Sequence, residues 1–441
     1  MAPLTKQNPK TLSAIVRAAA RVKKPVFVFV FVLLHYFVFR NFVLLSKDMI
    51  FGDFSAQSVA PGPIYGLERI SATKGVAIKY HAQNRLGVDF AQIYFPSQRP
   101  NSLGDSYSEN TTLDPAQRPS RYAPLVEYVC AMTICKLDFG YASFWHMVIQ
   151  ILAFFLVAYL AFRSLGLKNH FWPFVLFSDS CMFLTPVGVT WFGLGQFSLY
   201  VATGSLLLLW GMLKRNIVLI LLSALFAFVK WTSLPFGFTA LCVYILISKS
   251  RDDLQFSLLS AILFGSLFVV LSLPFIPESL AFIQGLLYQE SHRIPQGVSL
   301  AIYVPKPIVK SLPFLLSVAG YGMGKINKAG FIDLLPFLAG ASILLLLYPT
   351  LAFDYSAPIL LGLIPFMIYW AEAHRGNPAG QRMRQAILWT FLLFILLASY
   401  STTLTGSILV DIIIYLVVSI ALMVIPIFLP KHVGKSAHVT A

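Results

Sequence analysis

Charged residues are scarce in this chain of 441 residues. They make up only 12% of the sequence, whereas hydrophobic residues make up 57%. A soluble domain of this length carries about twice that share of charge, and it could not bury so much apolar surface. The composition therefore excludes an ordinary soluble protein and indicates that lipid is the main solvent. Because backbone polar groups in lipid need internal hydrogen bonds, the apolar segments are expected to be helices.

Cysteine is also scarce, with four residues at Cys130, Cys135, Cys181 and Cys242. Their spacing matches no metal site. Cys130 and Cys135 could pair in an oxidising compartment, but free apolar cysteines are the favoured interpretation. The carboxylates form no dense cluster either, which argues against a required metal ion. No cofactor is predicted.

Two further features are missing. The net charge is +15, but the basic residues are scattered over short connections and form no continuous face. The sequence therefore predicts no nucleic-acid partner. No internal repeat is visible, so the inverted-repeat sign of many transporters is absent as well.

The sequence does contain about twelve apolar stretches, to within two, although some are shorter than the roughly 20 residues that a membrane-spanning helix needs or are broken by proline. The first follows a basic start and lacks a small-residue cleavage site, so it is interpreted as a retained span. The predicted fold is an all-α polytopic membrane protein with about 12 transmembrane helices. The stretches are 25–46, 143–162, 172–190, 197–213, 216–230, 233–248, 254–276, 308–322, 331–349, 356–372, 385–401 and 409–429.

The basic residues crowd into alternate connections between these stretches. With a cytoplasmic N-terminus, the inner segments hold 19 of the 33 basic residues but only three acids, Asp252, Asp253 and Glu372. Basic residues favour the cytoplasmic side of a membrane. The pattern predicts that the long loops, and any chemistry that they carry, face away from the cytoplasm.

The predicted organisation follows from these two patterns. Long loops on a rigid scaffold tend to carry function. Inside the first loop, 122–138 has helical apolar spacing, which predicts a helix lying along the membrane interface. The parts are a cytoplasmic basic N-terminus at 1–24, a first transmembrane helix at 25–46, an extracytoplasmic loop at 47–142, transmembrane helices at 143–276, a second extracytoplasmic loop at 277–307, transmembrane helices at 308–429, and a cytoplasmic tail at 430–441.

Asp89 is the first candidate for chemistry. It lies in the stretch GVDFAQIYFPS, where an acid precedes an aromatic-rich run that includes Tyr94. A carboxylate can accept a hydroxyl proton while aromatic rings stack on the apolar face of a sugar. The alternative is an acid that only caps a helix. Asp53, close to the end of the first span, is a competing acid.

A second constellation joins Gln196 and Lys230. Gln196 starts one predicted helix and Lys230 ends the next, so the two are expected at the same membrane face. A lysine at the membrane centre costs roughly 2.5–3.5 kcal/mol, and less near the interface. It should therefore seek an anion, such as a lipid phosphate or the carboxylate of Asp179. A lysine whose head simply reaches the interface is the alternative.

Further candidates lie in the later outer loops. In YQESHRIPQGVSL, His292 and Arg293 could grip a phosphate, and Glu290 could orient them or act on an acceptor. Asp354 and Tyr355 lie at the outer end of a span, where Tyr355 is best interpreted as an interface anchor. Three weaker signals are the intramembrane acids Asp179 and Asp411 and the glycosylation sequon at Asn110.

These motifs and their order resemble an integral-membrane glycosyltransferase of the GT-C superfamily, and most of all glycosyltransferase family 87. The resemblance covers most of residues 89–370 at low identity. Ala123 departs from the proline pair of the family, and the segment before Asp89 is longer than expected. The resemblance rests on Asp89-Phe90 with Tyr94, on Tyr122-Ala123-Pro124, on Gly195-Gln196 with Lys230, on Asp354-Tyr355 and, loosely, on QGVSL.

The resemblance implies a GT-C-like fold and an inverting transfer of a sugar, mannose or arabinofuranose, from a polyprenyl-phosphate donor. The acceptor would be a lipid-linked or cell-envelope glycan. Asp89, or Asp53 in its place, would be the general base. The donor phosphate would be bound by Lys230, His292, Arg293 and Gln196, and the sugar or acceptor by Tyr94, Tyr122, Glu290 and Asp354. The membrane would be the bacterial plasma membrane or, alternatively, that of the endoplasmic reticulum.

Other classes of protein share parts of this pattern. A transporter or flippase for a lipid-linked saccharide would have similar spans and a basic cavity, but it would need no base and should show two related halves. An O-antigen ligase or polymerase should carry an Arg- and His-rich loop later in the chain. A non-enzymatic assembly subunit is the third alternative.

Overall fold

Helices dominate the computed structural model of the chain. Each apolar stretch predicted from the sequence contains helical structure, which confirms the all-α prediction apart from two minimal sheets. The structure describes residues 9–51, 68–70, 77–79, 87–99, 105–108, 119–292, 296–297, 299–327, 330–349, 351–352, 354–373, 378–400 and 408–425.

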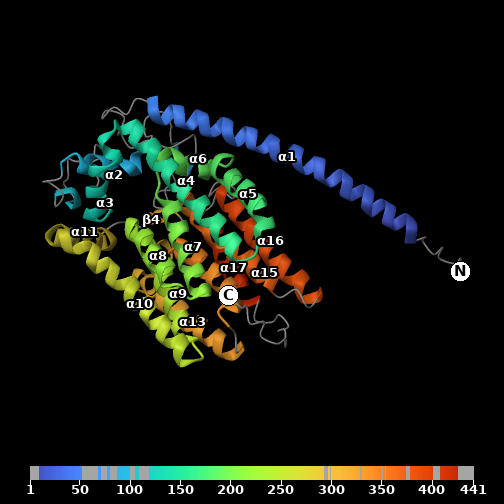
Figure 1. Ribbon diagram of the computed structural model, residues 1–441. Helices are drawn as coiled ribbons and strands as arrows, with labels where there is room; N and C mark the ends of the chain where they lie inside the picture. Colours follow the sequence, from blue (N-terminus) through green and yellow to red (C-terminus); the bar gives the residue numbers. More distant parts are fainter. Residues whose placement is uncertain are drawn as a thin grey trace.

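The main bundle is built from the apolar stretches (Figure 1). Its α-helices are α1 (Pro9–Phe51), α4 (Phe139–Ser164), α5 (Phe171–Phe183), α6 (Pro186–Leu194), α7 (Ser198–Lys214), α8 (Ile217–Val229), α9 (Leu234–Leu246), α10 (Arg251–Ser272), α13 (Leu312–Asn327), α14 (Leu335–Leu346), α15 (Ile364–Ala373), α16 (Pro378–Tyr400) and α17 (Ile408–Val424). Short 3-10 turns join several of them, namely η5 (Lys168–His170), η6 (Trp231–Ser233), η7 (Leu273–Phe275), η9 (Ile332–Leu334) and η10 (Asp354–Leu363).

Four of the described helices are long and apolar enough to cross a membrane. They are Val28–Phe51, Phe139–Ser164, the continuous run Arg251–Tyr288, and Gly380–Ser399. The pair α5 and α6, bent by 73°, can be counted as a fifth, and six shorter apolar helices have 10–17 residues. These helices support a helical membrane protein. Full-length spans are fewer than the predicted twelve because several of the predicted stretches form helices of only 10–17 residues, such as Trp231–Leu246 and Ile332–Leu346.

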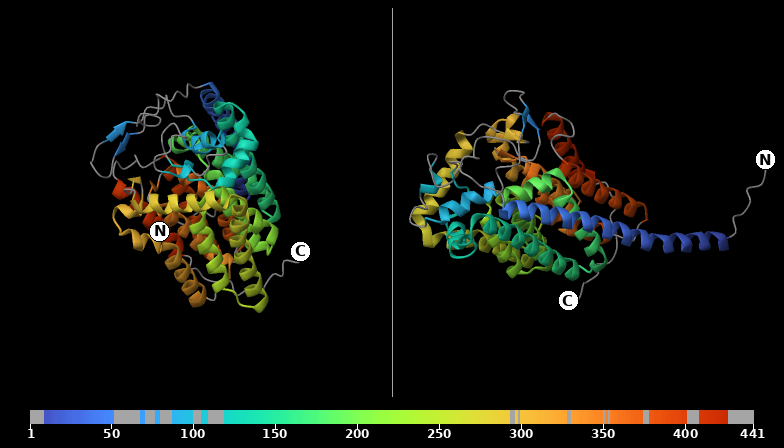
Figure 2. Two further views of the ribbon diagram at one scale, coloured as in Figure 1. Left: turned by 90° about the vertical axis from the view of Figure 1, so that its left-hand side faces the viewer. Right: turned by 90° about the horizontal axis from the view of Figure 1, so that it is seen from above.

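Helix α1 lies along the edge of the bundle and extends beyond it toward the N-terminus (Figures 1 and 2). Its described side chains include many exposed apolar groups, among them Phe29, Val32, Tyr36 and Phe39. Water would penalise such a surface by about 25 cal/mol for each Å² of apolar area, whereas lipid does not. The outer face of α1 is therefore suited to contact with membrane lipid.

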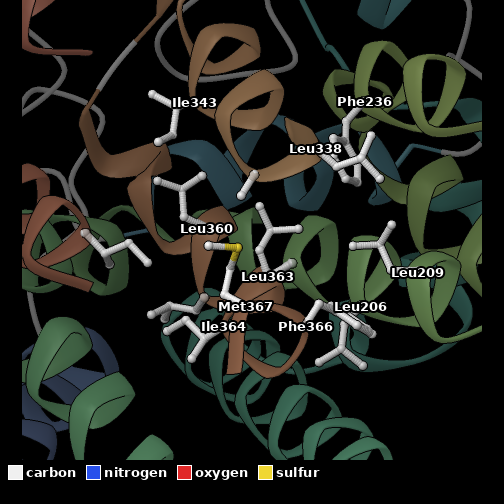
Figure 3. Packing of buried hydrophobic residues seen from close by; sticks show 14 of the residues in the cluster. Leu206, Leu209, Phe236, Leu338, Ile343, Leu360, Leu363, Ile364, Phe366 and Met367 are labelled. Carbon is white, nitrogen blue, oxygen red and sulfur yellow. The ribbon is translucent and has the colours of Figure 1, made fainter. Parts of the chain in front are cut away.

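The core contains apolar side chains from five elements, most of them leucine, isoleucine, phenylalanine and methionine, which pack against one another (Figure 3). Helix α7 contributes Leu206 and Leu209, and Phe236 comes from α9. The remaining labelled side chains belong to α14, η10 and α15. This packing fixes α7, and with it the turn that precedes α7 in the chain.

One end of the bundle gathers the connections that the sequence predicts to be cytoplasmic. Trp210 Nε1 donates a hydrogen bond to Ser164 Oγ at 3.1 Å, which places the end of α7 beside the end of α4. Arg215 forms a 3.1 Å ion pair with Asp253 and so joins the α7–α8 and α9–α10 hairpins. These contacts agree with the alternation of basic loops along the sequence.

The opposite end, called here the loop-bearing end, carries four further helices: α2 (Val88–Ser97), α3 (Pro124–Met132), α11 (Ile276–His292) and α12 (Lys306–Lys310) (Figures 1 and 2). Two 3-10 turns, η4 (Ile134–Lys136) and η8 (Leu300–Ile302), lie there too. The strands are very short. β1 (Glu68–Ile70) pairs antiparallel with β2 (Ala77–Lys79), and β3 (Gln296–Gly297) pairs parallel with β4 (Leu351–Ala352).

The structure corrects three sequence predictions. Cys130 and Cys135 form a disulfide, although free thiols were favoured, because the turn after α3 brings the two Cα atoms to 5.0 Å. The predicted loop at 277–307 is helical as far as His292, since α11 continues α10 through η7. Asp179 does not face Lys230; it lies 3.8 Å from His35 of α1, within the bundle.

Candidate functional site

Lys230 is the centre of a polar group at the loop-bearing end. Helix α8 ends at Val229, and Lys230 adopts an extended backbone before η6 begins. Its Nζ donates a hydrogen bond to Oε1 of Gln196 at 2.9 Å. The prediction that these two side chains meet at one face of the bundle is therefore confirmed by a direct contact across 34 residues of sequence.

Gln196 is held by a tight turn between α6 and α7. Helix α6 ends at Gly195, whose φ of 67° lies in the left-handed region that favours glycine. The N–H groups of Gly195 and Gln196 donate to the carbonyls of Phe192 and Trp191, which closes the turn. Gln196 itself is 2% exposed. The turn thus fixes a buried amide side chain at the start of α7.

Asp89 reaches the same place on the first turn of α2. Gly87, with a φ of 72°, begins this helix, and its N–H donates to the carbonyl of Gly193 at 2.7 Å. A Cβ added at Gly195 would lie 3.4 Å from the Cα of Gly87 and 3.0 Å from the Cβ of Phe90, so glycine permits this approach. The N-terminus of α2 is therefore docked on the turn that carries Gln196.

The charges around Lys230 are mixed. The carboxylate of Asp89 stabilises the positive charge of Lys230, whereas the guanidinium of Arg121 opposes it. An anion at the first turn of a helix also gains from the helix dipole. The five side chains Asp89, Arg121, Tyr122, Gln196 and Lys230 are named the Lys230 cluster from here on. It combines two cations, one carboxylate and one amide.

Aromatic rings form one wall of the Lys230 cluster. The ring centres of Tyr122 and Phe197 lie 4.5 Å apart, and Lys230 Nζ lies 5.8 Å from each ring centre. A cation within about 6 Å of a ring centre is attracted by the electrons of its face. Both rings belong to an apolar cluster formed where α2, α3, α4 and α7 meet. The ammonium group is thus held in a sheltered, partly apolar position.

Glu127 is a buried carboxyl group close to the segment that carries Tyr122. Glu127 of α3 is fully buried and accepts a 2.6 Å hydrogen bond from Ser120 Oγ, with Ser106 Oγ further away at 3.4 Å. Burial raises the pKa of Glu127 well above its usual value of 4.5, and the neighbouring hydroxyl groups only partly offset this. Tyr107 donates to the carbonyl of Tyr122 at 3.1 Å. These contacts tie segments 105–108 and 119–123 to α3.

Tyr94 is not brought into the Lys230 cluster. Its hydroxyl donates to the carbonyl of Leu137 at 3.0 Å, and its ring packs against Phe139 at 5.1 Å. Tyr94 lies five residues beyond Asp89, which turns it to another side of α2. Its described contacts are those of a side chain that docks α2 on η4 and α4.

The candidates of the later outer loops are placed only in part. β3 pairs with β4, and the N–H of Leu300 donates to the carbonyl of Leu347 at 2.9 Å, so the segment after α11 lies beside the one that leads to Asp354. The side chains of Glu290, His292 and Asp354 lie outside the described residues. So do Asp53, Asn110 and Arg293 as a whole.

Sequence reasoning missed four residues at or beside the Lys230 cluster. Arg121 and Glu127 flank the Tyr122 motif, and their importance depends on how segments 105–108 and 119–123 fold onto α3. His146 and Gln150 of α4 contact the turn at Gln196. These two residues could have been found from the sequence, because two polar side chains four residues apart in an apolar stretch cost free energy in the membrane and often have a function.

Among the described residues, no three His, Cys, Asp or Glu side chains come close enough together to hold a metal ion. No family model, no characterised protein and no solved structure matches this chain. The chemistry of the Lys230 cluster is therefore the basis for any functional conclusion. That cluster can bind an anion through Lys230 and Arg121, and it can accept a proton through Asp89.

Proposed function

We propose that this membrane protein is a glycosyltransferase that moves a sugar from a polyprenyl-phosphate donor to a hydroxyl group of a lipid-linked or cell-envelope glycan. One observation carries the proposal: the Lys230–Gln196 hydrogen bond lies within the electrostatic reach of Asp89, at the N-terminus of α2. A cation for a phosphate, an amide for hydroxyl groups and a carboxylate for a proton are the parts that such a transfer needs.

The reaction is a single displacement. Asp89 takes the proton of the acceptor hydroxyl, whose oxygen attacks the anomeric carbon of the donor sugar. The bond between that carbon and the phosphate oxygen breaks, and the lipid phosphate leaves with the electron pair. Lys230 and Arg121 stabilise the charge of the leaving phosphate. Because only one displacement occurs, the configuration at the anomeric carbon inverts.

Gln196 and the aromatic wall have supporting roles. The Gln196 amide holds Lys230 at 2.9 Å and has a further donor for a sugar hydroxyl or a phosphate oxygen. Tyr122 and Phe197 are buried, and their rings flank Lys230 Nζ, whose distance from each ring centre is 5.8 Å. In this proposal mannose and arabinofuranose are the preferred sugars, which follows from the resemblance to glycosyltransferase family 87 and not from the geometry.

The outer face of the membrane is the proposed place of the reaction. The Cys130–Cys135 disulfide lies between α3 and η4, beside the Lys230 cluster, and disulfides persist in oxidising compartments. The basic hairpins around Arg215 and Arg251 lie at the opposite end of the bundle, as the positive-inside rule requires of a cytoplasmic end. Both observations support a donor that has already crossed the membrane.

The test is a transfer assay with the full-length protein in lipid nanodiscs. Polyprenyl-phosphate mannose and polyprenyl-phosphate arabinofuranose are each supplied with a total glycolipid extract, and mass spectrometry follows the acceptors. We expect one donor to be consumed, with a glycolipid gaining the mass of one sugar. Donor binding without transfer, together with movement of the donor across a vesicle membrane, would instead identify a flippase.

Cells provide the second arm of this test. Lipid-linked glycans from cells with and without the gene should differ by one sugar residue, and the shorter glycan should accumulate in its absence. Identical glycan profiles, combined with no transfer in nanodiscs, would reject the proposal.

A further inference from the structure

Helix α4 places two polar side chains in the interior of the bundle. His146 is 2% exposed and Gln150 is fully buried, and they lie one helical turn apart. The proposed reaction uses neither of them. Burying a polar side chain costs free energy unless it forms hydrogen bonds, so the partners of these two residues are informative.

His146 contacts the residues next to Asp89 and Gln196 in the chain. Its Nε2 lies 3.2 Å from the carbonyl oxygen of Gly195, and its ring stacks on Phe90 with the ring centres 4.8 Å apart and an angle of 17°. Phe90 directly follows Asp89, and Gly195 directly precedes Gln196. One imidazole thus bridges the helix that carries the acid and the turn that carries the amide.

Gln150 contacts the next carbonyl of the same turn. Its Nε2 donates to the backbone oxygen of Gln196 at 2.8 Å. A carbonyl in a turn has no helical partner of its own, and a buried carbonyl without a hydrogen bond is unfavourable. The hydrogen bonds of His146 and Gln150 are therefore directed at the two residues that set the orientation of the Gln196 side chain.

We infer that His146 and Gln150 are positioning residues, which hold the Gly195–Gln196 turn against α2 so that Gln196 Oε1 faces Lys230. This inference rests on the proposed function for its effect on phosphate binding, but the placement of the turn can be measured independently. The action passes through Gln196, and neither α4 side chain needs to touch the substrate.

The first experiment measures how strongly the Gly195–Gln196 turn is protected from hydrogen exchange. In full-length protein in nanodiscs, hydrogen exchange is followed by mass spectrometry for peptides that cover residues 195–200. His146→Phe keeps a ring for Phe90 but loses the bond to Gly195, so exchange in this segment should rise about tenfold. His146→Gln, which retains a side-chain donor, should restore most of the protection. The control is His170→Phe, because His170 lies at the other end of the bundle beside Glu372.

The second experiment measures how tightly the protein binds a lipid phosphate. Binding of a polyprenyl monophosphate in phosphatidylcholine nanodiscs should weaken about tenfold in His146→Phe and in Gln150→Met, and His146→Gln should bind nearly as the wild type does. In a Gln196→Ala background, His146→Phe should cause no further loss, because the two substitutions act on one interaction. A purely structural effect would add in both backgrounds.

The outcomes separate the two proposals. If hydrogen exchange at 195–200 is unchanged in both His146→Phe and Gln150→Met, the positioning role is wrong, whatever the result of the lipid-phosphate binding experiment. Faster exchange in a protein whose wild type binds no polyprenyl phosphate keeps the positioning role and rejects the proposed substrate. If His146→Phe fails to fold, Gln150→Met and His146→Gln decide the question by the same two readings.

Discussion

Lys230 donates a hydrogen bond to the side-chain oxygen of Gln196 at 2.9 Å, although the α7–α8 hairpin separates the two residues in sequence. The bond joins the end of α8 to the start of α7, close to the N-terminus of α2. It leaves the remaining donors of the ammonium group for another partner.

Lys230→Met should weaken binding of a polyprenyl monophosphate about 30-fold, because a charge-assisted hydrogen bond to phosphate contributes about 2 kcal/mol. Methionine fills a similar volume, so the fold should persist. The measurement is a titration in nanodiscs of increasing lipid-phosphate content. Lys214→Met is the matched control, since Lys214 is exposed at the far end of α7. Equal affinities in Lys230→Met and the wild type would remove Lys230 from the phosphate site.

Asp89→Asn should abolish sugar transfer and leave binding of the lipid phosphate within a few-fold of the wild type. The amide keeps the shape of the carboxylate but cannot take up the proton. Initial rates in the nanodisc assay check this, with Asp105→Asn as the control, because Asp105 is an exposed acid at the same end of the bundle. Full turnover by Asp89→Asn would reject Asp89 as the base and leave Asp53 as the candidate base.

Gly87→Ala should destabilise the protein by about 3 kcal/mol and lower its melting temperature in detergent. The positive φ of 72° disfavours alanine, and its Cβ would lie 2.6 Å from Ser143 Oγ. Gly166→Ala isolates the first effect, because Gly166 has a φ of 75° but no neighbouring atom within 4 Å. It should cost about 1 kcal/mol. Equal melting temperatures for the two variants would contradict the close docking of α2 on α4.

Glu127 should make the stability of the loop-bearing end depend on pH. The raised pKa means that the folded state keeps its proton at pH values where the unfolded state has lost it. Stability should therefore fall as pH rises above about 4.5 toward the folded-state pKa. Melting temperatures of the wild type and Glu127→Gln between pH 4.5 and 8 check this, and the decline should be smaller in Glu127→Gln. Asp105→Asn serves as the control, and an identical decline in Glu127→Gln would contradict the assignment.

The disulfide should protect two of the four cysteines from alkylation. When membranes are denatured and alkylated before reduction, Cys181 and Cys242 should be labelled, and Cys130 and Cys135 should not. Peptide mass spectrometry gives the answer directly. Replacing both Cys130 and Cys135 with serine should cost about 2 kcal/mol, since the closed loop is short. Labelling of all four cysteines would remove a main support for the oxidising side of the membrane.

Much of the architecture could be predicted because the relevant signals are local. An apolar stretch forms a helix in lipid whatever its neighbours are, so the positions of α4, α7, α8 and α10 followed from composition. Gln196 and Lys230 could be paired because a short basic hairpin forces two helices to run antiparallel. Tyr122 and Asp89 were selected by motif, and the structure brings both to the Lys230 cluster.

Other features could not be predicted, since they depend on how distant segments pack. Tyr94 is predicted at the site because it belongs to the aromatic run that follows Asp89, but in the structure its hydroxyl donates to the carbonyl of Leu137. Asp179 was a candidate partner for Lys230, but the packing of α5 on α1 brings it to His35. The pairing of Cys130 with Cys135 required the turn between α3 and η4.

The sequence by itself determined that the protein is helical, that its helices are apolar and that polar candidates lie between them, because hydropathy and charge act residue by residue. Only the tertiary structure decided that Asp89 lies beside the paired Gln196 and Lys230, and that His146 and Gln150 contact the turn that carries Gln196. The physical reason is that hydrogen bonds and charge interactions act over a few ångströms, and only the packing of α2, α4, α7 and α8 brings those atoms within that distance.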